Sequence, residues 1–334
     1  MSSVVGQPTD KPSIAVVQQV AESLTPYIVR TPTVLWPDQS GPVAGGSLYI
    51  KLELLQRTGS FKPRGAVNTI LHWLRDNNAN ASAGTGPGVT AFSAGNHAIA
   101  TAYAAKHLGV SAKVVMPRTA NPFRVDRCRS LGAEVVFGEN INDLIHIVDK
   151  LQAQEGRMLI HPFEGQHTIE GTATVGLELC QDIADLDVVI VPVGGGGLIA
   201  GIASVVKQLQ PDCRIIGVEP TGAQGMRQSI EAGVPMEKVE VNTIADSLGA
   251  PMHAPLSFAL VQQHVEQLVQ VTDDQMRQAM RRMFTDMKLA VEPACAAGLA
   301  ALLGPLAGTL DGKRVAMIAC GSNIDIASYS RMVA

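Results

Sequence analysis

The sequence predicts an α/β protein with largely parallel sheets. Short apolar runs alternate with amphipathic segments along most of the 334 residues, as they do in chains built from β-α-β units. Apolar residues make up 46% of the chain and charged residues 17%, which is typical of a well-buried globular protein. The length allows two domains or one large one.

The expected strands are apolar runs bounded by turn residues. Their ranges are 48–54, 89–93, 113–116, 134–137, 158–161, 188–193, 215–219, 268–271 and 314–320. Helical patterns lie between most of them. Asn121 before Pro122 predicts a helix N-cap, and Thr272 with Gln275 predicts a capping box for a helix that runs to residue 287. The polar stretch 77–88 is expected to be a linker.

A long uncharged stretch, residues 188–206, is not expected to cross a membrane. By length it could span a bilayer, but Pro192 and four consecutive glycines interrupt it. We therefore expect a buried strand, a glycine loop and a buried helix.

The composition argues against several classes of function. A net charge of -4 without a lysine- or arginine-rich block argues against a nucleic-acid partner. Five scattered cysteines without C-x-x-C indicate neither a disulfide framework nor a zinc site, and they favour a reducing cytoplasm. The N-terminus lacks the features of a signal peptide. No H-x-x-x-H, H-E-x-x-H or G-x-S-x-G pattern supports a zinc or triad hydrolase.

Lys62 is the leading candidate for chemistry. It stands between an expected strand and an expected helix, with Gly59 before it and Pro63 directly after it. Burial at such a junction would lower the pKa of the lysine, and a neutral amine is the nucleophile of Schiff-base chemistry. A solvated lysine in a first helical turn is the plain alternative.

Two further motifs place backbone amides at expected helix starts. Ser93-Ala-Gly-Asn-His97 follows a strand and is suited to bind a carboxylate through its amides and its polar side chains. Gly194-Gly-Gly-Gly-Leu198 follows the most apolar strand and is suited to bind a phosphate. An ordinary helix cap and a tight turn are the plain alternatives.

The glycine loop also invites comparison with a dinucleotide site, since Glu219 ends the next expected strand as a ribose-binding acid would. No G-x-G-x-x-G register fits, however, because Gly195, Gly197 and Gly201 read G-x-G-x-x-x-G. An NAD-dependent dehydrogenase is therefore a remote alternative.

Two more residues stand where ligands bind in α/β proteins. Cys320 ends the last strong strand and starts Cys-Gly-Ser-Asn323, although a buried cysteine is often simply part of the core. Glu292 precedes Pro293 at an expected helix start and has either a capping or a site role.

Taken in order, these motifs resemble those of the fold-type II pyridoxal-phosphate enzymes, and most closely the serine/threonine dehydratases and serine racemases. The matching segments are Ser60-Phe-Lys-Pro-Arg-Gly-Ala66, Ser93-Ala-Gly-Asn-His-Ala98, Gly194-Gly-Gly-Gly-Leu198, Gly217-Val-Glu-Pro220, Thr243-Ile-Ala-Asp246, Val291-Glu-Pro293 and Cys320-Gly-Ser-Asn323. The resemblance implies the tryptophan synthase β-like fold, with two lobes that each hold a largely parallel sheet flanked by helices. Residues 1–84 and 161–334 would form a large cofactor-binding lobe, and residues 85–160 a small mobile lobe.

The resemblance also implies roles for matching residues. Lys62 would be the catalytic residue, because it would hold pyridoxal 5'-phosphate covalently and then move the Cα proton of the substrate. The residues expected to contact the cofactor are Phe61, Lys62, Asn96, Gly194, Gly195, Gly196, Gly197 and Cys320. The residues expected to contact the substrate are Ser93, Ala94, Gly95, Asn96 and His97.

Several residues depart from the pattern of the family. Ala94 stands where serine racemases have a second serine that protonates the other face of Cα, so elimination is expected to dominate over racemisation. Glu219 matches one ligand of the family's divalent cation, but 223–225 is Ala-Gln-Gly and lacks the expected aspartate, so no metal is expected. Ile99 and the segment Thr168-Ile-Glu-Gly-Thr172 also differ from the usual residues and indicate an altered substrate pocket.

The expected activity is a pyridoxal-phosphate-dependent dehydratase, or ammonia-lyase. It would convert an L-3-hydroxy amino acid of the serine or threonine type, or a bulkier one such as phenylserine or hydroxyaspartate, to a 2-keto acid and ammonia. A β-replacement synthase and a serine racemase are alternatives, and a non-catalytic relative is disfavoured by the complete motif set. A cytoplasmic homodimer is expected, without a nucleic-acid or membrane partner.

Overall fold

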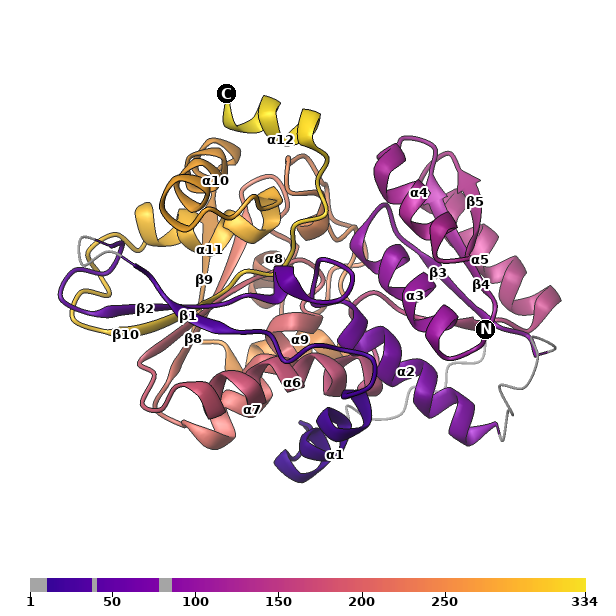
Figure 1. Ribbon diagram of the computed structural model, residues 1–334, viewed down its shortest axis with the longest axis horizontal. Coiled ribbons are helices and arrows are strands. Elements are labelled where there is room, and N and C mark those ends of the chain that lie inside the picture. Colours follow the sequence, from indigo (N-terminus) through magenta and orange to yellow (C-terminus); the bar gives the residue numbers. More distant parts are fainter. Residues whose placement is uncertain (1–10, 38–40, 78–85) are drawn as a thin grey trace.

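The chain folds into two β-sheets with helices against their faces (Figure 1). The computed structural model describes residues 11–37, 41–77 and 86–334. The larger sheet has the strand order β1 (Thr33–Leu35), β2 (Ser47–Lys51), β10 (Arg314–Ile318), β7 (Val188–Pro192), β8 (Arg214–Pro220) and β9 (Gln267–Val271). The smaller sheet has the order β5 (Glu134–Gly138), β4 (Ala112–Pro117), β3 (Val89–Phe92) and β6 (Met158–Leu159).

Helices fill the intervals between most strands. They are α1 (Ile14–Leu24), α2 (Pro63–Asp76), α3 (Asn96–His107), α4 (Pro122–Ser130), α5 (Ile141–Glu155), α6 (Gln166–Asp182), α7 (Gly197–Leu209), α8 (Gly225–Ala232), α9 (Pro255–His264), α10 (Asp273–Met287), α11 (Pro293–Leu303) and α12 (Ile326–Val333). Among the described residues every strand pair is parallel except β1 with β2. The predicted α/β class with largely parallel sheets is confirmed.

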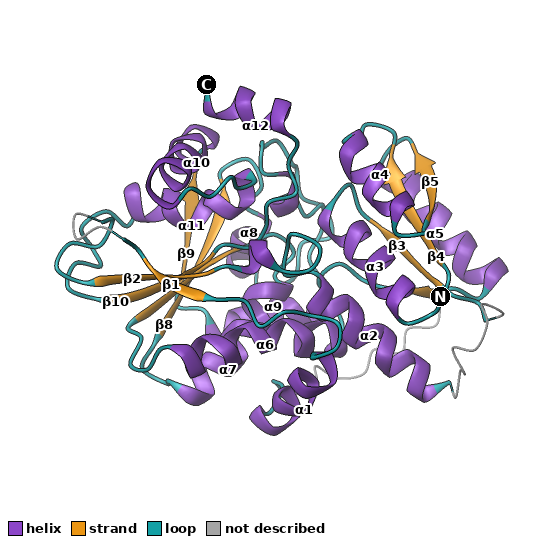
Figure 2. Ribbon diagram, viewed as in Figure 1, coloured by secondary structure: helices purple, strands orange, loops and turns teal. Residues whose placement is uncertain are grey.

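Helices cover both faces of each sheet (Figure 2). In the larger sheet, α10 and α11 lie on one face and α6 and α7 on the other, and the central strand β7 is buried at every position. A strand covered on both sides needs apolar residues throughout, which explains the unbroken run Val188–Val191. In β4 of the smaller sheet, Val114 and Met116 pack in a cluster with α3, whereas Val115 packs with residues of α5.

The predicted caps are confirmed. Asn121 accepts a hydrogen bond from the amide of Phe123 (2.9 Å) and Pro122 is the first residue of α4. Thr272 and Gln275 form the capping box of α10, which ends at Met287 as predicted. Most of the predicted linker, residues 78–85, lies outside the described residues.

Several predicted strand ends were wrong, most clearly in 48–54, and one strand was not predicted. The strand predicted over 48–54 ends at Lys51, and Glu53–Leu55 forms a 3-10 helix instead. The amide of Leu52 bonds the carbonyl of Pro32, and the chain then turns toward Lys62. The short strand β1 was not predicted, since three residues carry too little pattern.

The uncharged stretch 188–206 folds as expected into β7, a glycine loop and most of α7. Within the described ranges, no helix combines the length and the apolar character that crossing a bilayer requires.

Candidate active site

Lys62 lies at the N-terminal end of α2, where Pro63 is the first helical residue. Its Nζ donates a hydrogen bond to the carbonyl oxygen of Pro162 (2.5 Å) and lies 5.0 Å from the centre of the Phe61 ring. Burial lowers the pKa of Lys62 to about 8, and the nearby Cys320 and Glu292 offset only part of that effect. The amine is therefore much closer to its neutral, nucleophilic form than an exposed lysine is.

The loop before Lys62 is fixed against the segment that follows β10. Ser60 pairs with Gly321 in an antiparallel bridge, and the amide of Phe61 bonds the carbonyl of Cys320 (3.2 Å). Gly59 has a φ of 75°, and a Cβ there would lie 2.8 Å from Oδ1 of Asn323. The two motifs are thus adjacent in space although they lie at opposite ends of the chain.

A cavity in front of Lys62 collects residues from both sheets. Its lining residues are Phe61, Lys62, Asn96, Phe163, Pro192, Gly194, Gly195, Gly196, Gly197, Leu198, Ser247, Leu248, Glu292 and Cys320. Every residue that the sequence analysis assigned to the cofactor lines this cavity. Phe163, Ser247 and Leu248 were not identified from the sequence.

Asn96 is fully engaged within a buried polar network. Its Nδ2 donates to Oε1 of Glu292 (2.7 Å) and to the hydroxyl of Ser247 (3.2 Å). Its Oδ1 accepts from Nδ2 of Asn323 (2.6 Å), and that nitrogen also donates to the carbonyl of Thr58 (2.8 Å). Asn323 thereby connects the two loops described above to the start of α3.

Glu292 has a place in the site as well as at the start of α11. Its Oε2 accepts from the amide of Asn323 (3.1 Å) and lies 3.8 Å from Nη2 of Arg124. Burial raises the pKa of this carboxyl, and the Arg124 guanidinium opposes only part of the effect. Arg124, from α4, also bonds the carbonyl of Asn323 (3.0 Å) and pairs with Asp246. Arg124 was not identified from the sequence.

Cys320 is a buried thiol in the lining of the cavity. A hydrogen bond with Cys295 and burial raise the pKa of Cys320 well above its usual value. The group is therefore a neutral thiol at physiological pH, and it carries no negative charge that could hold a protonated ring nitrogen.

The glycine loop presents bare backbone to the cavity. Gly196 has a φ of 96°, and a Cβ at Gly195 would lie 2.1 Å from the Phe163 ring, so a side chain at either position is excluded. The loop ends at the start of α7, whose first amides have no partner inside the helix. Among the described residues, no backbone carbonyl outside the helix accepts a hydrogen bond from the amides of 194–198.

The residues assigned to the substrate point to different places: Ser93 and Gly95 lie beside Arg124, whereas His97 lies beside Lys62. Ser93 uses its Oγ to accept from the amide of Gly95 (3.1 Å), and a Cβ at Gly95 would lie 2.7 Å from Nη1 of Arg124. The ring of His97 points instead toward the carbonyl of Ile160 (2.7 Å), and burial lowers its pKa to about 3. His97 is therefore neutral, and it lines a second small cavity beside Lys62 together with Phe163.

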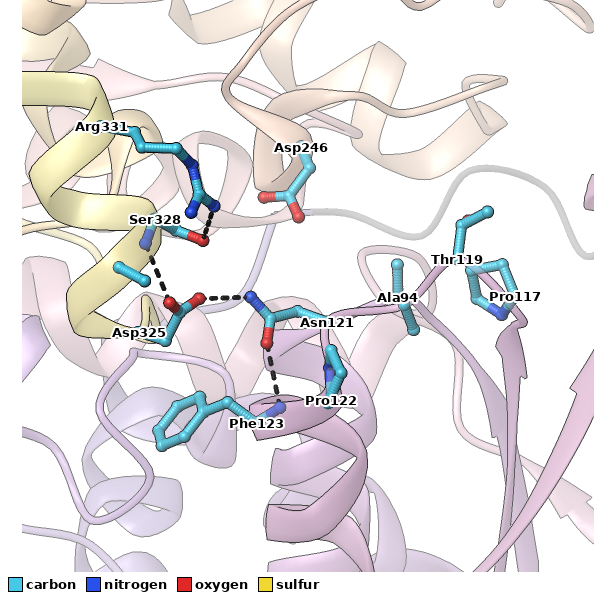
Figure 3. Close-up of a pocket in the computed structure, with 12 residues that line it drawn as sticks. Ala94, Pro117, Thr119, Asn121, Pro122, Phe123, Asp246, Asp325, Ser328 and Arg331 are labelled. Carbon is cyan, nitrogen blue, oxygen red and sulfur yellow. Dashed lines mark hydrogen bonds between the residues drawn. The ribbon is translucent and has the colours of Figure 1, made fainter.

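Ala94 lines an open cleft of about 690 Å³ between α4, α12 and the Asp246 loop (Figure 3). Across this cleft, Nδ2 of Asn121 donates to Oδ2 of Asp325 (2.6 Å), as Figure 3 shows. Asp325 in turn caps α12 through the amide of Ser328 (2.9 Å). Ala94 is thus exposed to the cleft, next to the loop that holds Asn96.

Glu219 lies away from this cavity. Its two oxygens accept from the amides of Met226 (2.8 Å) and Arg227 (3.0 Å) at the start of α8. Burial raises its pKa to about 7, against the effect of those hydrogen bonds. A helix-capping role accounts for this carboxylate, and the absence of a cation at this place stays a prediction.

The residues around the cavity fit pyridoxal phosphate. They supply a buried amine of lowered pKa, a side-chain-free loop with open amides for a phosphate, an aromatic ring beside the amine and a neutral thiol for the ring nitrogen. Their individual roles stay predictions.

Similarity to known proteins agrees with this fit. Residues 24–321 match the family model described as pyridoxal-phosphate dependent enzyme. The chain is 48% identical over 303 residues to phenylserine dehydratase of Ralstonia pickettii, covering 91% of each chain. It is 37% identical over 308 residues to L-threonine ammonia-lyase of Thermotoga maritima, covering 92% of this chain and 74% of that protein. The structure of maize serine racemase superposes with a TM-score of 0.88 at 33% identity, covering 96% of this chain and 97% of the other.

The predicted fold and cofactor are confirmed by these similarities. The structural relative is a serine racemase, from the branch that the motifs indicated, and the family model names the cofactor. The chain therefore belongs to the family of pyridoxal-phosphate-dependent enzymes, in the branch of the serine/threonine dehydratases and serine racemases.

Proposed function

We propose that this enzyme removes ammonia from an L-3-hydroxy amino acid with an aryl side chain, of which phenylserine is the simplest. The observation that carries the substrate class is the 48% identity to phenylserine dehydratase over 91% of each chain. At the coarser level the chain is a pyridoxal-phosphate-dependent lyase of the hydroxy amino acid dehydratase class, as predicted from the sequence. The net reaction turns the 3-hydroxy amino acid into the corresponding 2-keto acid and ammonia, with no oxidant or reductant.

Lys62 is the proposed base of the reaction. Bound pyridoxal phosphate supplies the electron sink for the charge that develops at Cα. The Lys62 amine, with its pKa near 8, holds the cofactor and takes the proton from Cα when the substrate is bound, because a general base works best when its pKa is near the working pH. Pro162, whose carbonyl accepts from Nζ, keeps the amine aimed into the cavity.

The substrate carboxylate is proposed to bind the backbone at the start of α3. The ring of His97 is engaged with the carbonyl of Ile160, whereas the Ser93 hydroxyl accepts from Gly95 and keeps its hydrogen free to donate. The amides of Ser93 and Gly95 are engaged as well. The following amides at the start of α3, together with the positive end of its dipole, are therefore the groups proposed to bind an anion. Arg124 adds a positive charge above Gly95. We therefore assign the carboxylate to these amides, the Ser93 hydroxyl and Arg124, with the ring of His97 in a supporting role.

The remaining roles follow from the cavity lining. The amides of 194–198 are proposed to hold the cofactor phosphate and Phe61 to pack on its ring. Asn96 is proposed to bind the 3-oxygen through Nδ2, in exchange for its longer hydrogen bond to Ser247. The neutral Cys320 is proposed to face the ring nitrogen. A thiol cannot stabilise a protonated ring nitrogen as an aspartate would, so the site favours prompt loss of the β-hydroxyl over transamination.

Apolar surface beside Lys62 supports a bulky side chain. The rings of Phe61 and Phe163 line both small cavities next to Nζ, together with Leu198. An aryl group buried against such rings gains both hydrophobic and ring-ring contact energy. A methyl group of threonine would gain less.

The test is a keto-acid assay with a panel of substrates. Purified enzyme saturated with pyridoxal phosphate is supplied with phenylserine, threonine, serine and hydroxyaspartate, and kcat/KM is measured for each. Phenylserine is expected to give the highest value, by about tenfold or more, since one aryl ring is worth at least 1.4 kcal/mol of burial.

A preference for threonine or serine would overturn the aryl assignment but keep the dehydratase. Keto acid from none of the four, together with turnover on addition of a thiol nucleophile, would indicate a β-replacement synthase instead. Racemised serine without keto acid would indicate a serine racemase.

We also propose that residues 85–160 form a small mobile lobe that closes on residues 1–84 and 161–334. The contacts between the lobes include polar pairs, such as Asn121 with Asp325 and Arg124 with Asn323, which opening would break. They also include an apolar cluster in which α1 and α2 pack against α3, and this cluster would act as the hinge side of the motion. Lobe closure would exclude water from the reacting atoms. Hydrogen exchange of α4 amides with and without substrate tests this, and equal exchange in both states would contradict a closing motion.

A cytoplasmic homodimer is proposed for the working enzyme. All five cysteines are free thiols, which suits a reducing compartment. Light scattering after gel filtration measures the assembly, and a mass near 35.2 kDa would contradict the dimer. Fractionation of the source cells tests the location.

A further inference from the structure

Helices α2 and α6 bring two imidazoles and a carboxylate together outside the cavity of Lys62. His72 comes from α2, and His167 and Glu170 come from α6. One possible ligand atom of each of these residues lies within 4.8 Å of the other two. The rings of His72 and His167 are stacked, with centres 3.7 Å apart and planes at 9°. Nδ1 of His167 lies 3.0 Å from Oε2 of Glu170.

We propose that His72, His167 and Glu170 bind one divalent transition-metal ion of the Zn²⁺ type. Neutral imidazole and carboxylate are ligands that Zn²⁺, Co²⁺ and Ni²⁺ share. Bonds of about 2.0–2.2 Å place adjacent ligands of one ion roughly 3.0–3.5 Å apart. The distance of 3.0 Å between Nδ1 of His167 and Oε2 of Glu170 already lies in this range.

His72 can complete the set with a small movement. Its ring is half-exposed, and among the described residues it makes no hydrogen bond, so its nitrogens are available. To bind the ion, the His72 ring would turn out of its stack on His167 and bring one nitrogen to the point between His167 and Glu170.

The other two ligands are held in place by their neighbours. Oε1 of Glu170 accepts from Nε2 of Gln166 (2.9 Å), which leaves Oε2 directed at His167. Nδ2 of Asn68 donates to the carbonyl of His167 (2.8 Å) and ties the start of α6 to α2. Ligands that are oriented by outer hydrogen bonds bind metals more tightly. Two protein nitrogens and one oxygen leave the remaining positions to water.

The site would join two helices that frame Lys62. Helix α2 begins directly after Lys62, and Thr168 of α6 lines the small cavity beside it. An ion that joins α2 to α6 stabilises the native state, because the unfolded chain does not hold the three ligands together. The site is distinct from Glu219, whose oxygens cap α8. It also includes Glu170, one of the residues where the sequence departs from its family.

The test is zinc binding to the holoenzyme after dialysis against a chelator. Calorimetric titration with Zn²⁺ is expected to show one tight equivalent, and the thermal unfolding midpoint should rise with added Zn²⁺. His72→Ala is expected to weaken that binding by about tenfold or more, since losing a ligand costs at least as much as losing a supporting residue. His72 is half-exposed, so this variant should fold and keep its cofactor spectrum.

Two further variants make the result specific. Glu170→Gln should weaken binding in the same way as His72→Ala. His146→Ala, at an exposed histidine of α5, should leave the titration unchanged. No tight equivalent in the parent enzyme would overturn the proposal, and so would equal affinity in His72→Ala and His146→Ala. None of these outcomes depends on the proposed substrate, because binding and unfolding are measured without turnover.

Discussion

Two buried polar clusters flank the first turn of α2, and they use opposite kinds of partner. Behind the helix, Arg64 bonds Glu53 (2.8 Å) and Glu178 (2.7 Å), and Lys51 bonds Glu178 (2.8 Å). In front of the helix, Lys62 has a carbonyl oxygen as partner, and Glu292 has the amide groups of Asn96 and Asn323. The first cluster pairs charge with charge at hydrogen-bonding distance. The second surrounds Lys62 and Glu292 mainly with neutral dipoles, and its nearest opposite charge, Arg124, stays 3.8 Å from Glu292.

The pKa values differ accordingly. Burial acts against the charge of Arg64, but Glu53 and Glu178 raise its pKa above its usual value, and Arg64 and Lys51 lower the pKa of Glu178 against burial. For Lys62 and Glu292 burial dominates, so the pKa of the lysine falls and that of the carboxyl rises. Full ion pairs keep groups charged and inert, whereas neutral partners leave groups near the point of gaining or losing a proton. The comparison separates the supporting cluster from the reacting one.

The largest effect is expected when the reacting cluster loses its amine. Lys62→Ala should lower kcat by at least about 10⁴-fold, because it removes both the cofactor attachment and the base. Lys106→Ala, at an exposed lysine of α3, is the matched control and should keep parental activity. Keto-acid production is the measurement, and ordinary turnover by Lys62→Ala would refute the assignment of the base.

Breaking the supporting cluster of Arg64, Glu53, Glu178 and Lys51 should lower the free energy of unfolding. Arg64→Met leaves Glu53 and Glu178 buried with fewer partners, and breaking a buried ion pair costs about 3–5 kcal/mol. Arg118→Met breaks the exposed pair with Glu139 and should cost less than about 1 kcal/mol. Urea unfolding monitored by circular dichroism compares the two variants. Similar losses would mean that the buried cluster does not hold α2 in place.

The lowered pKa of Lys62 predicts how cofactor attachment depends on pH. The neutral amine is the attacking group, so attachment to the apoenzyme should accelerate as pH rises and level off above about pH 8. A lysine of ordinary pKa would continue to accelerate toward pH 10.5. Stopped-flow absorbance with added pyridoxal phosphate measures the rate. A profile that still rises steeply at pH 9 would contradict the lowered pKa.

The sequence predicted local features of the site well and its long-range contacts poorly. Lys62, the glycine loop and the caps at Asn121 and Thr272 were accessible because each depends on neighbouring residues. The bonds from Asn323 and Glu292 to Asn96 join residues 227 and 196 positions apart. No local spacing encodes such a contact, so Glu292 stayed ambiguous.

Arg124 illustrates the same limit in another way. In the sequence it is one of several basic residues of an expected helix, and nothing distinguishes it from its exposed neighbours. The fold turns it toward Asp246 and Glu292 and buries it. The short strand β1 and the end of β2 at Lys51 were missed for a different reason, because tertiary pairing with a neighbour outweighs weak local preference there.

The smallest expected effect concerns the proton chemistry of the reacting cluster. Ala94 lines the cleft next to the Asn96 loop and offers no titratable group, while Lys62 is the base proposed for Cα. Ala94→Ser adds a hydroxyl at the position where serine racemases have their second proton donor, and it should raise racemisation of serine by a few fold with little change in keto-acid formation. Chiral chromatography of serine after incubation measures this, with Ala94→Val as a bulkier control that lacks a hydroxyl. Equal racemisation by the parent and both variants would show that a hydroxyl at position 94 is not what separates elimination from racemisation in this enzyme.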